Sequence, residues 1–432
     1  MRIVYLTAGA AGMYCGSCLH DNAIAKAMIK LGHDALLVPI YTPILTDETN
    51  ISQPTLFYGG LNVYMQQMSS LFRWLPRWAD GWLSSPRLVR WIAGRAMGTS
   101  AENLGALTVS MLRGIEGRQG KEVHRLCDWL QVHSPELLVF SNLLIAGCID
   151  ELKRRMNRPV VVVLQGDDIF CDSLPEPYRG QALVELRRLA KQVDMFIVHS
   201  RDYGLRMQQM LQFDEDRLQV SPLSIDTADF SSAPWGPPSE PRAPTIGYLA
   251  RLAPEKGLHL LVDAFIEIHR SGLHGDTRLA IAGWLGKQHE EYWAKQQEKL
   301  TSAGLDSQVT YHGSVDRPGK LHFLRSIDVL SVPTPYLEPK GLFVLEALAA
   351  GVPYVQPAHG AFPELYERLG GGHLFDPNDT AAYAARLRHV LDDLSAAQAL
   401  GRDGQQRLLS TSASEHEAQH LLQLFSNLLH SN

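Results

Sequence analysis

The sequence lacks any apolar run of the roughly 20 residues that a membrane-spanning helix needs. Its N-terminal run, Met1–Thr7, is too short for a signal peptide and predicts a buried first strand instead. We therefore expect a cytoplasmic protein, or one that touches a membrane only peripherally.

Cysteine is scarce, and positive charge is not in excess. Five cysteines among 432 residues are too few, and odd in number, for a disulfide framework, which favours a reducing compartment. The 40 Lys and Arg residues are outnumbered by 46 Asp and Glu residues, and the net charge of −6 argues against nucleic acid as a partner. With 45% hydrophobic residues, the chain suits two or three globular domains.

Short apolar runs alternate with longer segments of helical spacing along most of the chain. Runs that are apolar throughout are typical of parallel strands covered by helices on both faces. We therefore predict an α/β protein in which each half is a doubly wound, Rossmann-like parallel sheet. The predicted strands are Ile3–Thr7, Ala35–Pro39, Leu137–Phe140, Val160–Leu164, Met195–Val198, Leu218–Val220, Thr245–Leu249, Leu279–Ala282, Val309–His312, Val329–Val332 and Tyr354–Gln356.

A proline-rich segment marks the boundary between the two halves. Residues 232–244 contain five prolines, so they can form neither a helix nor a central strand and predict a stiff surface connector. In chain order, the sequence predicts a first domain at 1–230, a linker at 231–243, a second domain at 244–405 and a C-terminal helix at 406–432. That last helix can pack on either domain.

An insertion at about 47–118 in the first domain interrupts the alternation of strands and helices. Within it, Leu71–Met97 carries four tryptophans and five arginines. Two interpretations stay open: a helical element whose tryptophans pack on the domain, and an amphipathic surface that contacts anionic lipid or a sugar ligand.

The segment Asp328–Pro353 carries the strongest chemical signal. A buried strand at its start is followed by a proline-bounded loop, and a helix begins near Gly341. Ligands of doubly wound sheets bind at the carboxyl ends of the strands, and a helix N-terminus there suits a phosphate. Glu338 in the loop and Glu346 inside the helix are then placed to accept hydrogen bonds from sugar or ribose hydroxyls.

A second turn, within Thr245–Gly257, places Arg251 and Lys256 after another predicted strand. Two cations in one such turn can hold a diphosphate without a bound metal. Taken alone, the same pair is also typical of an ordinary surface turn.

Together these segments resemble the donor site of the retaining glycosyltransferases of family 4, which have the GT-B fold of two Rossmann-like domains facing a cleft. The resemblance covers nearly all of the chain outside Asp47–Arg118. The matching motifs are Glu338-x7-Glu346 with Ala347–Pro353, the turn Ala250–Gly257, the hinge-side segment Ser221–Thr227 and the helix end Leu31–Asp34.

The resemblance implies a role for each matching residue. Arg251 and Lys256 would hold the donor diphosphate, and Glu338, which completes the implied catalytic set, would contact the transferred sugar. Glu346 would hold the nucleotide ribose. The remaining implied donor-binding residues are Gly12 in the first loop, Gly283 and His312 at the base pocket, and Gly341 and Leu342, whose backbone would cap the phosphate nearest the sugar.

The chain departs from the family pattern after the strand at 160–164. The family often has a His there, whereas this chain has Gln165, which could donate a hydrogen bond to the donor sugar but cannot act as an acid or base. Asp167 and Asp168 follow as candidates for the acceptor side, although two acids in such a loop are also typical of a helix cap. In the hinge segment, Leu223 and Ser224 stand where Asn-Gly is common.

The predicted function is the transfer of a sugar from a nucleotide-diphosphate-sugar to an acceptor hydroxyl, with retention of anomeric configuration and without a metal or a cofactor. The acceptor is a saccharide, a lipid-linked molecule or a small molecule. The alternatives are a nucleotide-sugar epimerase or a sugar phosphorylase on the same fold, and a non-catalytic sugar- or lipid-binding relative.

Three further patterns carry little by themselves. Cys15-x-x-Cys18 falls where a helix begins, a place that favours thiolates, but no second such motif accompanies it, and two packed cysteines are the simpler interpretation. Asp214 and Asp216 form an acidic turn without further metal ligands. The histidines show no ligand spacing.

Overall fold

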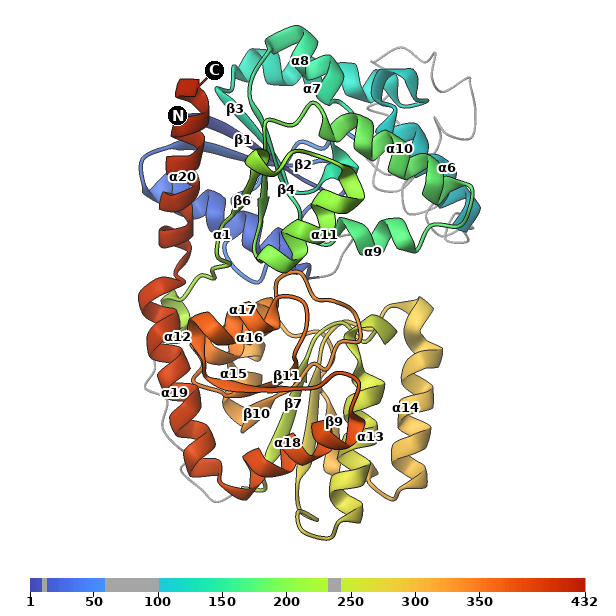
Figure 1. The fold of residues 1–432 in the computed structure, drawn as a ribbon, viewed down its shortest axis with the longest axis vertical. Helices are drawn as coiled ribbons and strands as arrows, with labels where there is room; N and C mark the ends of the chain where they lie inside the picture. The colour runs from blue at the N-terminus through green and yellow to red at the C-terminus, as the bar shows by residue number, and fades with distance from the viewer. Residues whose placement is uncertain (10–13, 59–100, 232–241, 432) are drawn as a thin grey trace. The chain divides into compact units, whose positions relative to one another are not determined.

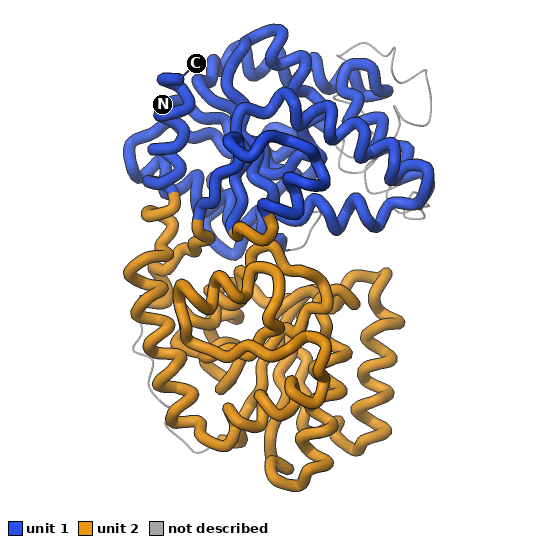
Figure 2. The backbone as a smooth tube through the Cα atoms, in the orientation of Figure 1, with its two compact units in different colours: residues 1–199, 204–221, 418–432 blue, residues 200–203, 222–417 orange. Residues whose placement is uncertain are grey.

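The computed structural model describes residues 1–9, 14–58, 101–231 and 242–431. The Trp- and Arg-rich segment 71–97, Gly12 and most of the predicted linker lie outside these residues. The chain divides into two compact units, coloured in Figure 2. Unit 1 comprises Met1–His199, Gly204–Ser221 and Ala418–Asn432, and unit 2 comprises Ser200–Tyr203 and Pro222–Glu417.

Each unit contains a six-stranded parallel sheet with helices around it, which confirms the α/β, doubly wound prediction (Figure 1). The strand order is β2-β1-β3-β4-β5-β6 in unit 1 and β12-β11-β10-β7-β8-β9 in unit 2. In each unit the chain adds strands first on one side of the first strand and then on the other. The order therefore reverses between β1 and β3 and between β7 and β10, and ligands of doubly wound sheets bind at such a switch point.

The strands lie close to their predicted positions, because continuous apolar runs such as Val160–Val163 are buried along their whole length. β12 is a strand that the sequence did not predict: it lies at the sheet edge and is only partly buried, so its apolar signal is weak. The strands are β1 (Arg2–Thr7), β2 (Asp34–Pro39), β3 (Leu137–Phe140), β4 (Val160–Val163), β5 (Met195–Val198), β6 (Leu218–Val220), β7 (Thr245–Leu249), β8 (Arg278–Ala282), β9 (Val309–Tyr311), β10 (Val329–Leu330), β11 (Tyr354–Pro357) and β12 (Gly372–Phe375).

The described helices connect these strands and end the chain. Those in the first part are α1 (Gly16–Lys30), α6 (Ala101–Leu112), α7 (Gly120–His133), α8 (Ile149–Met156), α9 (Asp167–Asp172), α10 (Tyr178–Ala190), α11 (Arg201–Leu211) and α12 (Ala228–Ser231). Those that follow are α13 (Leu258–Arg270), α14 (Glu290–Ser302), α15 (Arg317–Ser326), α16 (Leu342–Ala349), α17 (Phe362–Leu369), α18 (Thr380–Asp392), α19 (Leu394–Thr411) and α20 (Ser414–Ser431). Within the described residues, no helix combines the length and apolarity that crossing a bilayer requires.

The predicted C-terminal helix, 406–432, is interrupted in the structure by the break between α19 and α20. Ala413 forms a parallel bridge with Ile225 there, and the amide of Ile225 donates to the carbonyl of Ser412 at 3.1 Å. After the break, the apolar face of α20, with Leu421 and Phe425, packs into the core of unit 1 beside Ile24 of α1.

Helix α13 has a glycine on either side of it, and the two glycines have nearly the same left-handed backbone but different surroundings. Gly257 has φ +74° at the start of the helix, and a Cβ there would lie 2.0 Å from the carbonyl oxygen of Pro333. Gly272 has φ +73° after the helix, and a Cβ there would meet nothing within 4 Å. At Gly257 both the positive φ angle and the nearby Pro333 carbonyl favour glycine. At Gly272 only the positive φ angle does.

This contrast predicts unequal costs for two chemically identical substitutions. Gly272→Ala should lower the free energy of unfolding by about 1–2 kcal/mol, the cost of a left-handed Ala. Gly257→Ala should cost at least about 1 kcal/mol more, because the Pro333 carbonyl must also move. Urea unfolding of both variants measures the difference, and equal losses would show that the approach to Pro333 is not rigid.

Candidate functional site

The turn after β7 and the loop after β10 meet at the switch point of unit 2. Lys256 ends the short turn η5 (Pro254–Lys256), and its Nζ donates to Glu338 Oε2 at 2.5 Å. Both side chains are largely buried, with 14% of Lys256 and 7% of Glu338 exposed. Two predicted residues separated by 82 positions are thus brought together.

The carboxylate of Glu338 is held from two sides. Its Oε1 accepts from the backbone N–H of Gly341 at 3.3 Å, while Oε2 is bound to Lys256. Burial by itself would raise the pKa of Glu338, but the charge and hydrogen bond of Lys256, with the Gly341 N–H, outweigh it and hold that pKa below its usual value. Glu338 is therefore an anion at neutral pH and a fixed hydrogen-bond acceptor.

Helix α16 begins at this point. Gly341 is its N-cap, with φ +74°, and Leu342 is its first residue. The first backbone N–H groups of a helix have no partner within it and carry a partial positive charge. The structure thus places the two predicted phosphate-capping residues at a helix N-terminus, next to the Lys256–Glu338 pair.

The turns after β7, β8 and β9 also pack against one another. Gly283 has φ +150°, and a Cβ there would lie 1.7 Å from the carbonyl oxygen of Ala250. The N–H of Gly283 donates to the carbonyl of Gly313 at 2.8 Å, beside His312. Burial lowers the pKa of His312, with a smaller contribution from the charge of His322, so its ring is neutral at neutral pH.

Arg251 lies in the turn after β7, beside Ala250. Its guanidinium donates to Glu255 at 3.2 Å, and about a third of its side chain is exposed. Its carbonyl accepts from the Tyr248 hydroxyl at 3.0 Å, which fixes the turn. Arg251 is therefore a partly exposed cation at the same sheet edge as Lys256.

Glu346 has a partner that the sequence did not indicate. Nζ of Lys320, from α15, donates to Glu346 Oε1 at 2.5 Å, and both side chains are at least nine-tenths buried. The two residues lie on different helices, 26 positions apart. The sequence signal for a buried Lys320 was weak. It consisted only of the helical spacing that puts Lys320 on the same side of α15 as the buried residues Phe323 and Leu324.

The Lys320–Glu346 pair predicts a large cost for removing one partner. Lys320→Met should lower the free energy of unfolding by about 3–5 kcal/mol, because it leaves a buried carboxylate without its cation. The double variant Lys320→Met with Glu346→Gln should recover part of that loss.

The matched control is Lys299→Met, which removes the exposed pair with Asp263 at 2.6 Å. That change should cost less than about 1 kcal/mol. Urea unfolding compares the three variants, and a loss for Lys320→Met as small as that of the control would contradict a tightly coupled buried pair.

In unit 1, Gln165 belongs to a polar network at the carboxyl ends of β1, β3 and β4. Its Nε2 donates to Asp21 Oδ1 at 3.1 Å and to the carbonyl of Ser141 at 2.9 Å. Asp21 Oδ2 in turn accepts from the Thr7 hydroxyl at 2.7 Å. The side-chain amide of Gln165 thus makes two contacts within the chain, and its role towards the donor sugar stays a prediction.

The two predicted acceptor-side acids are held differently. Asp167 is almost fully buried, and its carboxylate accepts from the backbone N–H groups of Leu143 at 2.7 Å and of Gln165 at 3.0 Å. Burial raises its pKa to about 6 despite these hydrogen bonds. Asp168 instead accepts from Arg206 at 3.3 Å. Asp167 therefore anchors two loops, and an acceptor-binding role stays a prediction for both.

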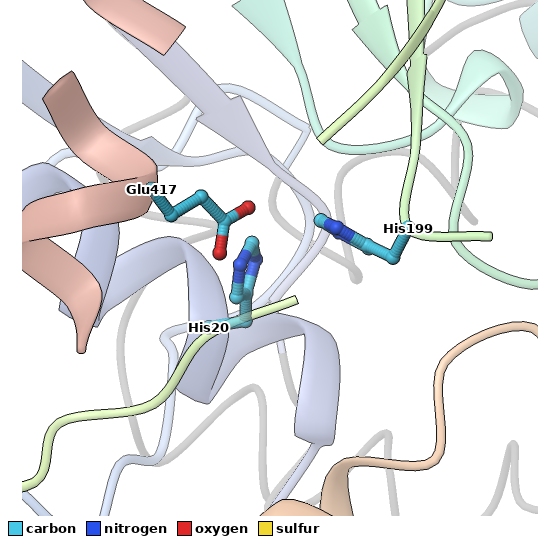
Figure 3. A group of neighbouring side chains, drawn as sticks. All are labelled: His20, His199 and Glu417. Atoms are coloured by element: carbon cyan, nitrogen blue, oxygen red, sulfur yellow. The ribbon is translucent and has the colours of Figure 1, made fainter. Parts of the chain in front are cut away.

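The spacing of the histidines in the sequence predicts no metal site, but the fold brings two of them together. His20 of α1 and His199, which follows β5, pack edge to face with ring centroids 4.6 Å apart (Figure 3). Both histidines belong to unit 1, whereas Glu417, the third residue labelled, belongs to unit 2. The expected absence of a metal stays a prediction.

The second half of the chain is similar to known proteins. Residues 231–407 match the family model described as glycosyl transferases group 1. A glycogen synthase of Mycobacterium tuberculosis is 35% identical over 196 residues, which cover 44% of this chain and 45% of that protein. The match thus spans about half the length of that relative.

Solved structures are similar over the whole chain. Sucrose-phosphate synthase from Thermosynechococcus elongatus superposes with a TM-score of 0.70 at 16% identity, covering 100% of both chains. Anabaena Alr3699/HepE, solved in complex with UDP-glucose, has a TM-score of 0.66 at 16% identity and covers 99% of this chain and 100% of its own. Identities this low show that the fold is shared, and the shared fold is that of the GT-B glycosyltransferases.

Proposed function

We propose that the chain transfers a sugar from a nucleotide-diphosphate-sugar to an acceptor hydroxyl, because residues 231–407 match the family model of glycosyl transferases group 1 and the chain has the GT-B fold. The observation that carries this proposal is the cluster at the switch point of unit 2. Lys256, Glu338 and the N-terminus of α16 at Gly341 lie together there, where a doubly wound sheet binds its ligand.

The cluster suits a leaving nucleoside diphosphate. Negative charge grows on the diphosphate as the bond to the sugar breaks, and fixed positive groups that stabilise this charge lower the barrier. Lys256 and Arg251 would supply full charges, and the N-terminus of α16, from the N–H of Leu342 onward, would supply a partial one. No divalent metal is needed for this neutralisation, so we propose that the transfer is metal-independent.

The two glutamates would bind hydroxyl groups. A carboxylate has about four acceptor positions, and the contacts of Glu338 with Lys256 and Gly341 use two of them. Glu338 would accept from the transferred sugar, and Glu346, oriented by Lys320, would accept from the nucleotide ribose. Gly283 and His312 lie on neighbouring turns, where a base would be bound.

We further propose that the anomeric configuration is retained. Glu338 is a weak base because its pKa is low, and Lys256 holds its carboxylate in place. The departing phosphate oxygen would then take the proton of the acceptor hydroxyl on the same face of the sugar. Retention follows when the bond forms on the face from which the diphosphate leaves.

The first experiment compares donors and acceptors. UDP-, GDP- and ADP-sugars are incubated with saccharide, lipid-linked and small-molecule acceptors, and UDP-glucose is the first choice because a similar structure binds it. We expect release of nucleoside diphosphate that requires an acceptor, a product of retained configuration by NMR, and the same rate after chelation with EDTA. Turnover of nucleotide-sugar without an acceptor would support an epimerase, and no turnover would support a binding protein.

A second experiment removes the proposed charge. Lys256→Ala should lower the transfer rate at saturating donor by at least about tenfold, or ~1.4 kcal/mol of barrier. Adding Glu338→Gln relieves the buried unpaired carboxylate, so folding of the double variant separates lost charge from lost stability. Lys295→Ala, which removes an exposed surface lysine, is the matched control. A smaller loss for Lys256→Ala in folded protein would contradict its role.

A further inference from the structure

Two thiols lie one helical turn apart at the start of α1. Cys15 is the N-cap of this 15-residue helix, and Cys18 is its third residue. Cys18 is part of an apolar cluster in the core of unit 1, and Cys15 packs against that cluster. All five cysteines lie in the described part of the chain, and none forms a disulfide there.

The two thiols differ in access. Cys18 is 2% exposed, whereas Cys15 is only partly buried. An anionic sulfur is favoured near the first N–H groups of a helix, where Cys15 lies. An outside reagent would therefore meet Cys15 first, with Cys18 behind it.

We propose that Cys15 and Cys18 are a site of reversible oxidation, at which a low-molecular-weight disulfide converts the two thiols into an intramolecular disulfide. The Cys-x-x-Cys motif, to which the sequence analysis assigned no role, places the two thiols one helical turn apart, as this reaction needs. The site differs from the donor site of unit 2 and needs no sugar substrate.

The reaction consists of two thiol–disulfide exchanges. The thiolate of Cys15 attacks the small disulfide and forms a mixed disulfide, and one small thiolate leaves. Cys18 then loses its proton to solvent and attacks the Cys15 sulfur, which releases the second small thiolate. These two thiolates take up the two protons of the protein thiols. The protein is oxidised by two electrons, and the small disulfide is reduced to two thiols.

Oxidation would also reach Gln165. The Cys18 sulfur lies 3.9 Å from the Thr7 hydroxyl, which donates to Asp21, and Asp21 holds the Gln165 amide. Drawing Cys18 towards Cys15 loosens the contact with Thr7 and so the placement of Gln165. This consequence rests on the proposed glycosyl transfer, whereas disulfide formation does not.

The experiment follows the thiols directly in the full chain. The protein is equilibrated in buffers with increasing oxidised over reduced glutathione, quenched with acid, denatured, alkylated and mapped by mass spectrometry. We expect Cys15 and Cys18 to lose alkylation together, with loss of two hydrogens from the peptide that holds both, and to regain it with dithiothreitol. Alkylation of both thiols in every buffer would overturn the proposal.

Variants separate ring closure from simple modification. In Cys18→Ser, Cys15 should keep glutathione as a mixed disulfide, which the wild type should not accumulate. Cys127→Ser, which removes a buried thiol of α7, should behave as the wild type. Glutathione retained on Cys15 of the wild type, or disulfides between chains, would contradict an intramolecular pair.

Activity then tests the connection to Gln165. Oxidation should lower the transfer rate by about tenfold, as expected for one misplaced polar contact, and Cys15→Ser should lose this response. Disulfide formation with an unchanged transfer rate would overturn the connection. The thiol measurement uses no substrate, so failure of the proposed function would be recognised separately from failure of the dithiol.

Discussion

Parallel winding brings the carboxyl ends of all six strands to one edge of each sheet, and the rest of the site depends on this constraint. In unit 2 the chain turns away in opposite directions from β7 and β10, so the segments that follow them diverge and leave their first residues side by side. The salt bridge between Lys256 and Glu338 joins those two segments. Close backbone approaches, at Gly257 to Pro333 and at Gly283 to Ala250, hold the neighbouring turns in register. The charges therefore rest on rigid backbone rather than on mobile loops.

Both glutamates of the Glu338-x7-Glu346 signature are paired with a lysine from another element. Lys256 binds Glu338, and Lys320 binds Glu346. A buried carboxylate without a cation would become protonated and lose much of its strength as an acceptor. Lys256 holds the Glu338 carboxylate as an anion, and Lys320 places a cation against the Glu346 carboxylate. The pairing thus holds two hydrogen-bond acceptors in fixed positions in unit 2.

The fold could be predicted largely from the sequence, because continuous apolar runs between helical segments are typical of parallel strands buried on both faces. β12 was missed because it lies at a sheet edge and only two of its four residues are buried, which leaves a weak apolar signal. In the site, contiguous motifs identified Lys256, Glu338 and Gly341. Lys320 was missed because its partner lies 26 positions away on another helix. The orientation of the Gln165 amide depends on Asp21, 144 positions earlier, and the residues around Gln165 do not indicate such a contact.

The course of α20 has a consequence for biosynthesis. Residues Leu421 and Phe425 belong to the core of unit 1, together with Ile3 and Ile24 from the opposite end of the chain. A ribosome releases these last residues only after all of unit 2 has been made. The first unit therefore waits with an uncovered apolar surface on α1 while the second is synthesised, and chaperones would have to shield that surface until α20 has been made.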